Sequence, residues 1–258
     1  MKKYLHLFYT KYICNFAYPT EIYANLIYSL VTVMTAYVYW GNGQSPSQHS
    51  VLTYIVYMPF VSVFLNVGFC TIFVSEWVRT GELSNYLVKP VSLPKYILTL
   101  TLAGKVSNFL QTIVPTMLIV AVLVVGTQIQ MPDLANIGLF ALLVPLVFML
   151  SFMLDLALSY VAFWLTDVWS LGHFKNFMLG FLGGSILPLD IYPTWVQNIA
   201  QYLPFQYIFY IPIKVLMGKP IQNLTYTIGI LCVWIIVLYI IMQLLYAKGK
   251  RRYEAYGH

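Results

Sequence analysis

The sequence predicts an all-α polytopic membrane protein in which six helices cross the bilayer. Of the 258 residues, 60% are hydrophobic and only 9% are charged, whereas a soluble domain carries about 25% charged residues. The apolar residues form long blocks, which is typical of helical spans and not of the short alternating strands of a membrane β-barrel. Composition therefore excludes a soluble, disordered or coiled-coil protein as a whole, and we expect a single transmembrane domain over residues 1–258.

Residues 1–20 predict an amphipathic helix that lies on the membrane surface and ends at Pro19. On a helical wheel, the apolar face carries Leu5, Phe8, Tyr9, Tyr12, Ile13 and Phe16. The opposite face carries Lys3, His6, Thr10 and Lys11. A basic, partly ordered tail is the alternative.

Six apolar segments approach the roughly 20 residues that a helix needs to cross the hydrocarbon core. The fourth is long enough to tilt or to extend beyond the bilayer, and the fifth is short and glycine-rich, which favours a broken helix. The six predicted spans are 22–40, 51–74, 106–125, 137–165, 174–189 and 224–246.

The distribution of positive charge predicts the orientation of these spans. Lys and Arg number 14, and all except Lys214 and Lys219 lie in the two termini or in the loops between spans 2 and 3 and between spans 4 and 5. Since cytoplasmic segments carry the excess of Lys and Arg, both termini are expected in the cytoplasm and the protein in the inner (plasma) membrane. The same rule explains the net charge of +6 without nucleic acid as a partner.

Residues 76–95, EWVRTGELSNYLVKPVSLPK, form a charged loop and contain a helix-like stretch, 81–88, which Pro90 stops. A short polar helix at the cytoplasmic face is suited to docking a soluble partner. An ordinary solvated connection fits the composition equally well.

Residues 186–220 predict short re-entrant helices in the outer leaflet, because prolines and interfacial aromatic residues punctuate an apolar segment. The prolines are Pro188, Pro193, Pro204 and Pro212. Just before them, Gly180 and Gly184 form a small-xxx-small pair suited to close helix packing.

The sequence contains no GxxxxGK[ST], HExxH or GxSxG motif. The four histidines lie outside the spans, and Cys14, Cys70 and Cys232 lie far apart, so we expect no catalytic site, metal or cofactor in this chain.

Four polar residues within the spans are candidates for a substrate path, because polar groups in spans face a cavity or a neighbour. They are Asn66, Asn108, Gln111 and Asp155. Asp155 has no predicted Lys or Arg partner in a span. The alternative to a role in the substrate path is that Asp155 is a structural carboxylate bonded to Ser151 or Ser159, one helical turn away on either side.

Two strings within this topology resemble the permease subunit of type-2 ABC (ABC-2) exporters. The string GELSNYLVKPVSLPKYI fits the family pattern G-x-L-x-x-x-L-x-[KR]-P at Gly81, Leu83, Leu87, Lys89 and Pro90. The string GGSILPLDIYPTWVQNIAQYLPFQY resembles a G…P…hP-x-W…LP-x-x-Y stretch at Gly184, Pro188, Pro193, Trp195, Leu203, Pro204 and Tyr207.

The resemblance implies a non-catalytic subunit that pairs with a second permease chain, as a homodimer or heterodimer. It also implies a separate cytoplasmic ABC ATPase that binds ATP and Mg. The loop around 76–90 would couple to that ATPase and 166–175 would make a smaller contact. The implied docking side chains are Glu76, Arg79, Glu82 and Lys89, and the implied outer gate is Gly184, Pro188, Pro193, Trp195 and Pro204.

Three other functions remain open from the sequence. A secondary active transporter should show intramembrane charge pairs or two similar halves with interrupted helices. An intramembrane enzyme should show clustered catalytic groups, and a structural or receptor-like subunit would show neither. The 22 Tyr, 16 Phe and 6 Trp mildly favour an amphipathic, hydrophobic or cationic substrate, although rings that face lipid explain them as well.

Overall fold

The computed structural model is all-helical, with no strand among the residues that it describes. These residues are 2–17, 23–24, 27, 30–32, 34–35, 37–41, 46–65, 70–88, 92–126, 132–165, 168–221 and 223–253. The long helices are α1 Lys2–Ala17, α3 Pro46–Leu65, α4 Cys70–Arg79, α6 Leu93–Gly126, α7 Leu134–Tyr160, α8 Trp169–Phe181 and α11 Leu224–Arg252. The short ones are η1 Tyr37–Gly41, α5 Leu83–Leu87, η2 Val161–Phe163, η3 Leu189–Ile191, α9 Thr194–Ala200, η4 Phe205–Tyr207 and α10 Tyr210–Leu216.

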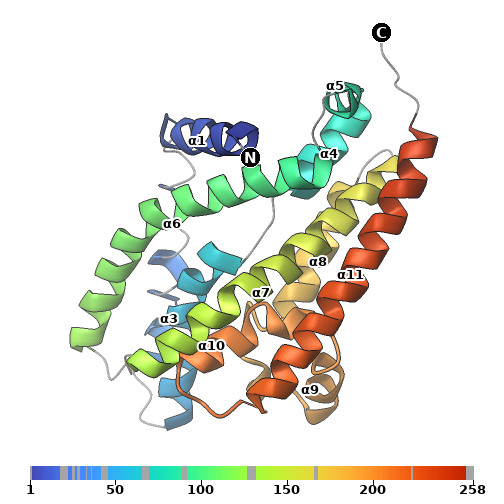
Figure 1. Ribbon diagram of the computed structural model, residues 1–258. Coiled ribbons are helices and arrows are strands. Elements are labelled where there is room, and N and C mark those ends of the chain that lie inside the picture. The colour runs from blue at the N-terminus through green and yellow to red at the C-terminus, as the bar shows by residue number, and fades with distance from the viewer. Residues whose placement is uncertain are drawn as a thin grey trace.

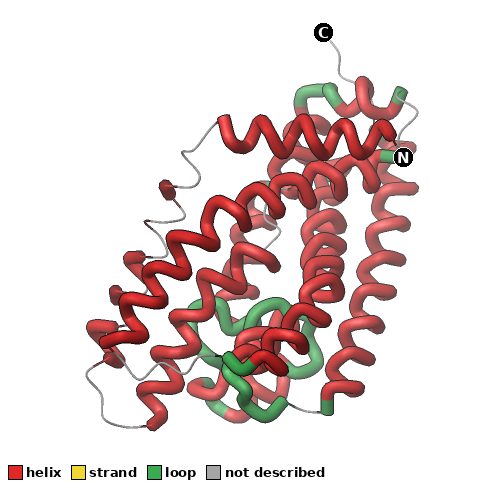
Figure 2. Tube along the Cα trace, turned by 60° about the vertical axis from the view of Figure 1, so that its left-hand side comes forward, coloured by secondary structure: helices red, strands yellow, loops and turns green. Residues whose placement is uncertain are grey.

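Helices α7 and α11 lie side by side and form the long axis of the molecule (Figures 1 and 2). Within the described residues, two helices are long and apolar enough to cross a membrane, Leu134–Phe163 and Leu224–Arg252. At 1.5 Å per residue each is roughly 45 Å long, which exceeds the hydrocarbon core. The helices run in the same direction, because Tyr160 near the end of α7 packs on Tyr246 near the end of α11.

Apolar side chains fill the interior of the bundle and also cover its outside. Leu143, Leu150 and Leu231 are fully buried between the helices. On α11, four apolar side chains are nevertheless more than half exposed: Val233, Ile236, Ile240 and Leu244. A helix that is apolar all round is typical of a membrane span, and the outward face of α11 fits contact with lipid.

The two ends of the bundle carry different elements. Helix α5 and both ends of the chain lie at one end, and α9 and α10 lie at the other (Figure 1). Most of the loops gather around α9 and α10 (Figure 2).

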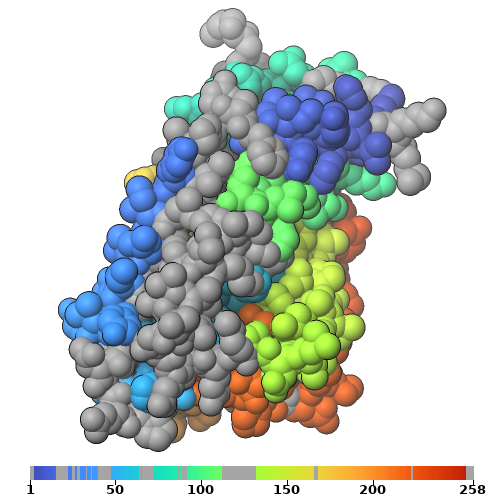
Figure 3. All heavy atoms as spheres, turned by 90° about the vertical axis from the view of Figure 1, so that its left-hand side faces the viewer, coloured from blue at the N-terminus to red at the C-terminus, as the bar shows by residue number. Residues whose placement is uncertain are grey.

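Helix α1 lies across α6 at the end that carries the chain termini (Figures 1 and 3). The side-chain amide of Asn15 donates to Ser107 Oγ at 2.7 Å and joins the two helices. Leu5, Tyr9 and Ile13 are 76%, 61% and 49% exposed. The predicted helix is therefore present, with an exposed apolar stripe of the kind that a membrane surface would cover.

The helix boundaries differ from the predicted spans in three places. The described part of 51–74 belongs to α3, which begins before this segment, and to α4, which ends after it, and 106–125 is the second half of the longer α6. The predicted fifth span, 174–189, is wrong in its extent: α8 has 13 residues and ends at Phe181, which gives about 20 Å, too short to cross the hydrocarbon core. Of the 19 residues of the first predicted span, 22–40, the structure describes 12, and all 12 are helical.

Helix α8 ends where two glycines turn the chain. Gly184 has φ +79, a conformation that glycine adopts without steric cost. The Gly183 carbonyl accepts the Tyr210 N–H at 3.1 Å, so the turn is fixed to the start of α10. This turn is the physical reason for the short fifth helix.

A buried ion pair joins α7 to α8. Lys175 Nζ lies 2.5 Å from Asp155 Oδ1, and the two side chains are 5% and 0% exposed. The expectation that Asp155 lacks a basic partner is wrong, because α8 begins at Trp169 and carries Lys175 into the bundle. Ser159 donates to the backbone carbonyl of Asp155, not to its carboxylate, at 2.7 Å.

We predict that Asp155→Asn destabilises the protein by about 3–5 kcal/mol, because it leaves a buried ammonium without its counter-charge. Lys175→Met should have a similar effect. The variant that carries both substitutions should regain more than half of the stability that either single variant loses. The unfolding midpoint in mild detergent measures this. The control is Glu76→Gln, which breaks an ion pair about half exposed and should change stability by less than about 1 kcal/mol. Equal effects at both pairs would contradict the prediction.

Candidate functional site

The turn between α4 and α5 is built around the carbonyl of Gly81. Gly81 has φ +78, and its carbonyl accepts the Ser84 hydroxyl at 2.7 Å and the Tyr253 hydroxyl at 2.9 Å. Thr80 Oγ1 donates to the Glu76 carbonyl at 2.8 Å and closes the end of α4. The backbone of this predicted coupling loop is therefore fixed from both sides.

Aromatic packing holds the inner face of α5 against α4 and α6. The Trp77 ring stacks on Tyr86 with 4.3 Å between centroids, and Tyr86 packs on Tyr96 at 5.2 Å. Leu83 is fully buried beneath them. Burial, with a smaller contribution from Tyr86, raises the pKa of Tyr96 to about 12, so its hydroxyl stays protonated at neutral pH.

Glu82, Asn85 and Val88 form the α5 outer face, and all three are exposed. Val88 is 86% exposed. Beside them, Arg79 Nη2 lies 2.8 Å from Glu76 Oε1, in an ion pair whose two side chains are 60% and 50% exposed. The structure thus brings together Glu76, Arg79, Gly81, Glu82 and Leu83 of the predicted loop. Leu87 is the last residue of α5, and Lys89 and Pro90 lie outside the described residues.

At the opposite end, the predicted gate residues sit at the starts of short helices. Pro188 precedes η3, Pro193 precedes α9 and Pro204 precedes η4, as suits a residue whose φ is preset and which lacks an N–H. The Gly184 carbonyl accepts a hydrogen bond from the Tyr54 hydroxyl at 2.7 Å. A Cβ on residue 184 would lie only 2.7 Å from the oxygen of this hydroxyl. Trp195 points outward and is 63% exposed.

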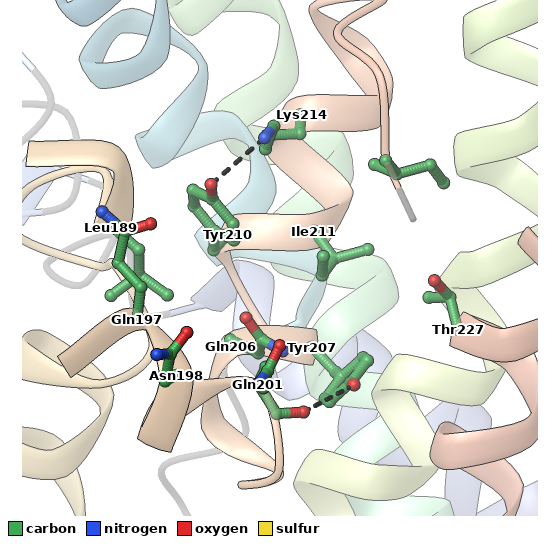
Figure 4. Close-up of a pocket in the computed structure, with 11 residues that line it drawn as sticks. Leu189, Gln197, Asn198, Gln201, Gln206, Tyr207, Tyr210, Ile211, Lys214 and Thr227 are labelled. Carbon is green, nitrogen blue, oxygen red and sulfur yellow. Dashed lines mark hydrogen bonds between the residues drawn. The ribbon is translucent and has the colours of Figure 1, made fainter. Parts of the chain in front are cut away.

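A cavity of about 260 Å³ lies between these short helices (Figure 4). The charge of Lys214, which lines the cavity, is balanced by Asp190 at 3.6 Å, and the Tyr210 hydroxyl donates to the same carboxylate at 2.6 Å. Four carboxamides line it: Gln197, Asn198, Gln201 and Gln206. This cavity was not predicted from the sequence, although amides at 197, 198 and 201 on one face of a helix in an apolar segment are a signal that could have indicated it.

The structure describes three of the four predicted path residues. Asn108 and Gln111 lie one turn apart on α6, and the Gln111 side-chain nitrogen is buried without a hydrogen-bond partner among the described residues. Asp155 is closed off in its ion pair with Lys175, and Asn66 lies outside the described residues. The described residues contain no group of three His, Cys, Asp or Glu side chains that could hold a metal ion.

Comparison with a curated protein identifies a partial relative. Residues of this chain are 32% identical over 72 positions to Nodulation protein J of Rhizobium leguminosarum bv. viciae. The match covers 28% of this chain and 28% of the relative.

Comparison with family models covers nearly the whole chain. Residues 22–257 match the model of the ABC-2 family transporter protein, and the subunits of this family are membrane components that lack an ATPase domain. The long apolar helices agree with a membrane protein. The chain therefore belongs to the ABC-2 family of transporter membrane proteins.

Proposed function

We propose that this chain is the permease subunit of an ATP-driven ABC exporter, which forms the substrate path and couples it to a separate ATPase subunit. The structural feature that supports this proposal most is helix α5. It is a five-residue helix with a fixed backbone, and its outer face is exposed at the end of the bundle where both chain ends lie (Figure 1).

The chemistry of the α5 outer face suits a protein partner. It combines a carboxylate (Glu82), an amide (Asn85) and an exposed apolar side chain (Val88), and charges at its edge would select the partner by complementarity. The inner face is packed through Leu83 and Tyr86. A push on α5 would therefore move α4 and α6 with it, as a rigid body.

The proposed topology has six membrane-crossing segments with both termini in the cytoplasm. The fifth would cross as α8 followed by the glycine turn, not as one continuous helix. Support comes from the basic end of α11, where Lys250, Arg251 and Arg252 lie at the same end as α5, as the positive-inside rule requires. Helix α1 would lie on the cytoplasmic leaflet. Residues 186–220 would form the outer re-entrant helices, with Gly184, Pro188, Pro193, Trp195 and Pro204 as the outer gate.

The partners that we propose are a cytoplasmic ABC ATPase and a second permease chain, alike or homologous. ATP and Mg would bind to the ATPase alone. Its closure on ATP would move the two permease halves and open the path outward. Asn66, Asn108 and Gln111 remain candidates for that path, whereas we place Asp155 in the structural pair with Lys175.

A secondary active transporter is the second candidate, and one observation favours it. Asp155 and Lys175 form a buried charge pair, and intramembrane ionisable residues are common in ion-coupled transporters. The two candidates differ in whether an ATPase is required.

We predict that the tagged chain, purified from its host in gentle detergent, retains an ATPase subunit that mass spectrometry identifies. Replacing residues 76–90 with a Gly-Ser linker should abolish this retention, because it removes the α5 outer face. A chain that purifies alone, with no nucleotide-dependent partner, would instead support the secondary transporter.

We predict that Glu82→Lys lowers permease-stimulated ATPase activity about tenfold or more, because it reverses an exposed charge on the proposed docking surface. The matched control is Asp133→Lys, the same charge reversal just before α7, which should leave the activity unchanged. Equal activities in the wild type and Glu82→Lys would exclude Glu82 from coupling.

We predict that a cysteine at Lys219 reacts with a membrane-impermeant thiol reagent only from outside the cell, in a chain whose native cysteines are replaced by serine. A cysteine at Lys250 should react only from the cytoplasm. Reaction of the Lys219→Cys chain from the cytoplasm alone would reject the proposed topology.

A further inference from the structure

Helix α11 is hydrogen-bonded to other elements at two places, just after its last residue and at Trp234 in its first half. At the inner end, the Tyr253 hydroxyl donates to the Gly81 carbonyl at 2.9 Å. Further toward the other end, the Trp234 indole N–H donates to the Tyr202 carbonyl at 3.0 Å, in the loop that follows α9. The helix thus contacts both the α4–α5 turn and the short helices around the cavity.

The inner contact is held rigidly. The Tyr253 N–H donates to the Gly249 carbonyl at 3.0 Å, so the helical hydrogen-bonding pattern reaches this tyrosine. The Tyr253 ring packs edge-on against Phe163 at 6.2 Å. Gly249 lies so close to the same phenylalanine that a Cβ there would overlap its ring.

The outer contact belongs to a second packed region. Leu231 and Thr227 are buried, and Thr227 lines the cavity with Gln201 and Tyr210 (Figure 4). Movement of α11 along its axis would therefore displace both the cavity wall and the loop after α9.

The segment between the two contacts is one uninterrupted helix. It contains no proline, and the 19 residues that separate Trp234 from Tyr253 span about 28 Å. The interior hydrogen bonds of an α-helix make such a segment stiff, since kinks require a proline, a bulge or an inserted group.

We propose that α11 is a mechanical link that transmits movement of the α4–α5 turn to the outer helices, with Tyr253 as its positioning residue. The proposal rests on the coupling role of α5 proposed above. Tyr253 holds the Gly81 carbonyl, and through it the orientation of α5, relative to the end of α11.

A double-mutant cycle in the complex with the copurified ATPase subunit tests this link. Tyr253→Phe removes only the hydroxyl, and Trp234→Phe removes the indole donor. Loss of one such hydrogen bond corresponds to about a two- to tenfold change in an equilibrium, and we expect each variant to lower permease-stimulated ATPase turnover by that factor. KM for ATP and assembly with the ATPase should be unchanged.

The double variant distinguishes a link from two local contacts. Independent sites this far apart have additive effects, which would multiply the two losses. If α11 alone carries the coupling, ATPase turnover in the double variant should be no more than about twofold lower than in the stronger single variant. The control is Tyr239→Phe, an exposed tyrosine on the same helix, which should leave turnover unchanged.

A second measurement does not depend on Trp234. A fluorophore on Asn198→Cys, an exposed position of α9 beside the cavity, should report an ATP-dependent change in the complex. Tyr253→Phe should reduce that change about fivefold, and Tyr239→Phe should not. Additive losses in the cycle, or an unaltered signal in Tyr253→Phe, would overturn the link while leaving the exporter intact. A wild-type chain that stimulates no ATPase would overturn both proposals.

Discussion

The buried pair of Asp155 and Lys175 is the interaction on which the arrangement of the second half of the molecule depends. It fixes α8 against α7 in surroundings where an unpaired charge would be severely penalised. Once α8 is fixed, its end at Phe181 determines where the glycine turn lies. The Gly183 carbonyl of that turn accepts the Tyr210 N–H and so positions the start of α10. The cavity and the short helices around it follow from this chain of contacts.

The fold class could be predicted from the sequence because it depends on composition and on the length of apolar segments, which tertiary packing does not alter. The family followed from the two strings that include Gly81 and Gly184. Both glycines have a positive φ in the structure, so the pattern that carries the resemblance also marks two turns that other residues would strain.

The details that failed depend on contacts between residues far apart in the chain. The charge count places Lys175 in the loop between spans 4 and 5, and no local pattern in the sequence pairs it with Asp155, 20 positions earlier. The extent of the fifth span was overestimated because apolar residues continue through the glycine turn to Leu189. The Tyr253 contact with Gly81 could not be predicted at all, since no local pattern joins positions 172 residues apart. The roles of the coupling and gate residues stay predictions.

The close approach of Gly249 to Phe163 restricts how α11 can move. Successive residues of an α-helix are about 100° apart around its axis, and the neighbours of Gly249 are Lys248 and Lys250, both exposed. Turning the helix by one position would drive a lysine side chain into a space that does not admit even a methyl group. Helix α11 is therefore prevented from rotating about its axis. The displacements left to it are tilting and sliding, which preserve the orientation of its exposed apolar face.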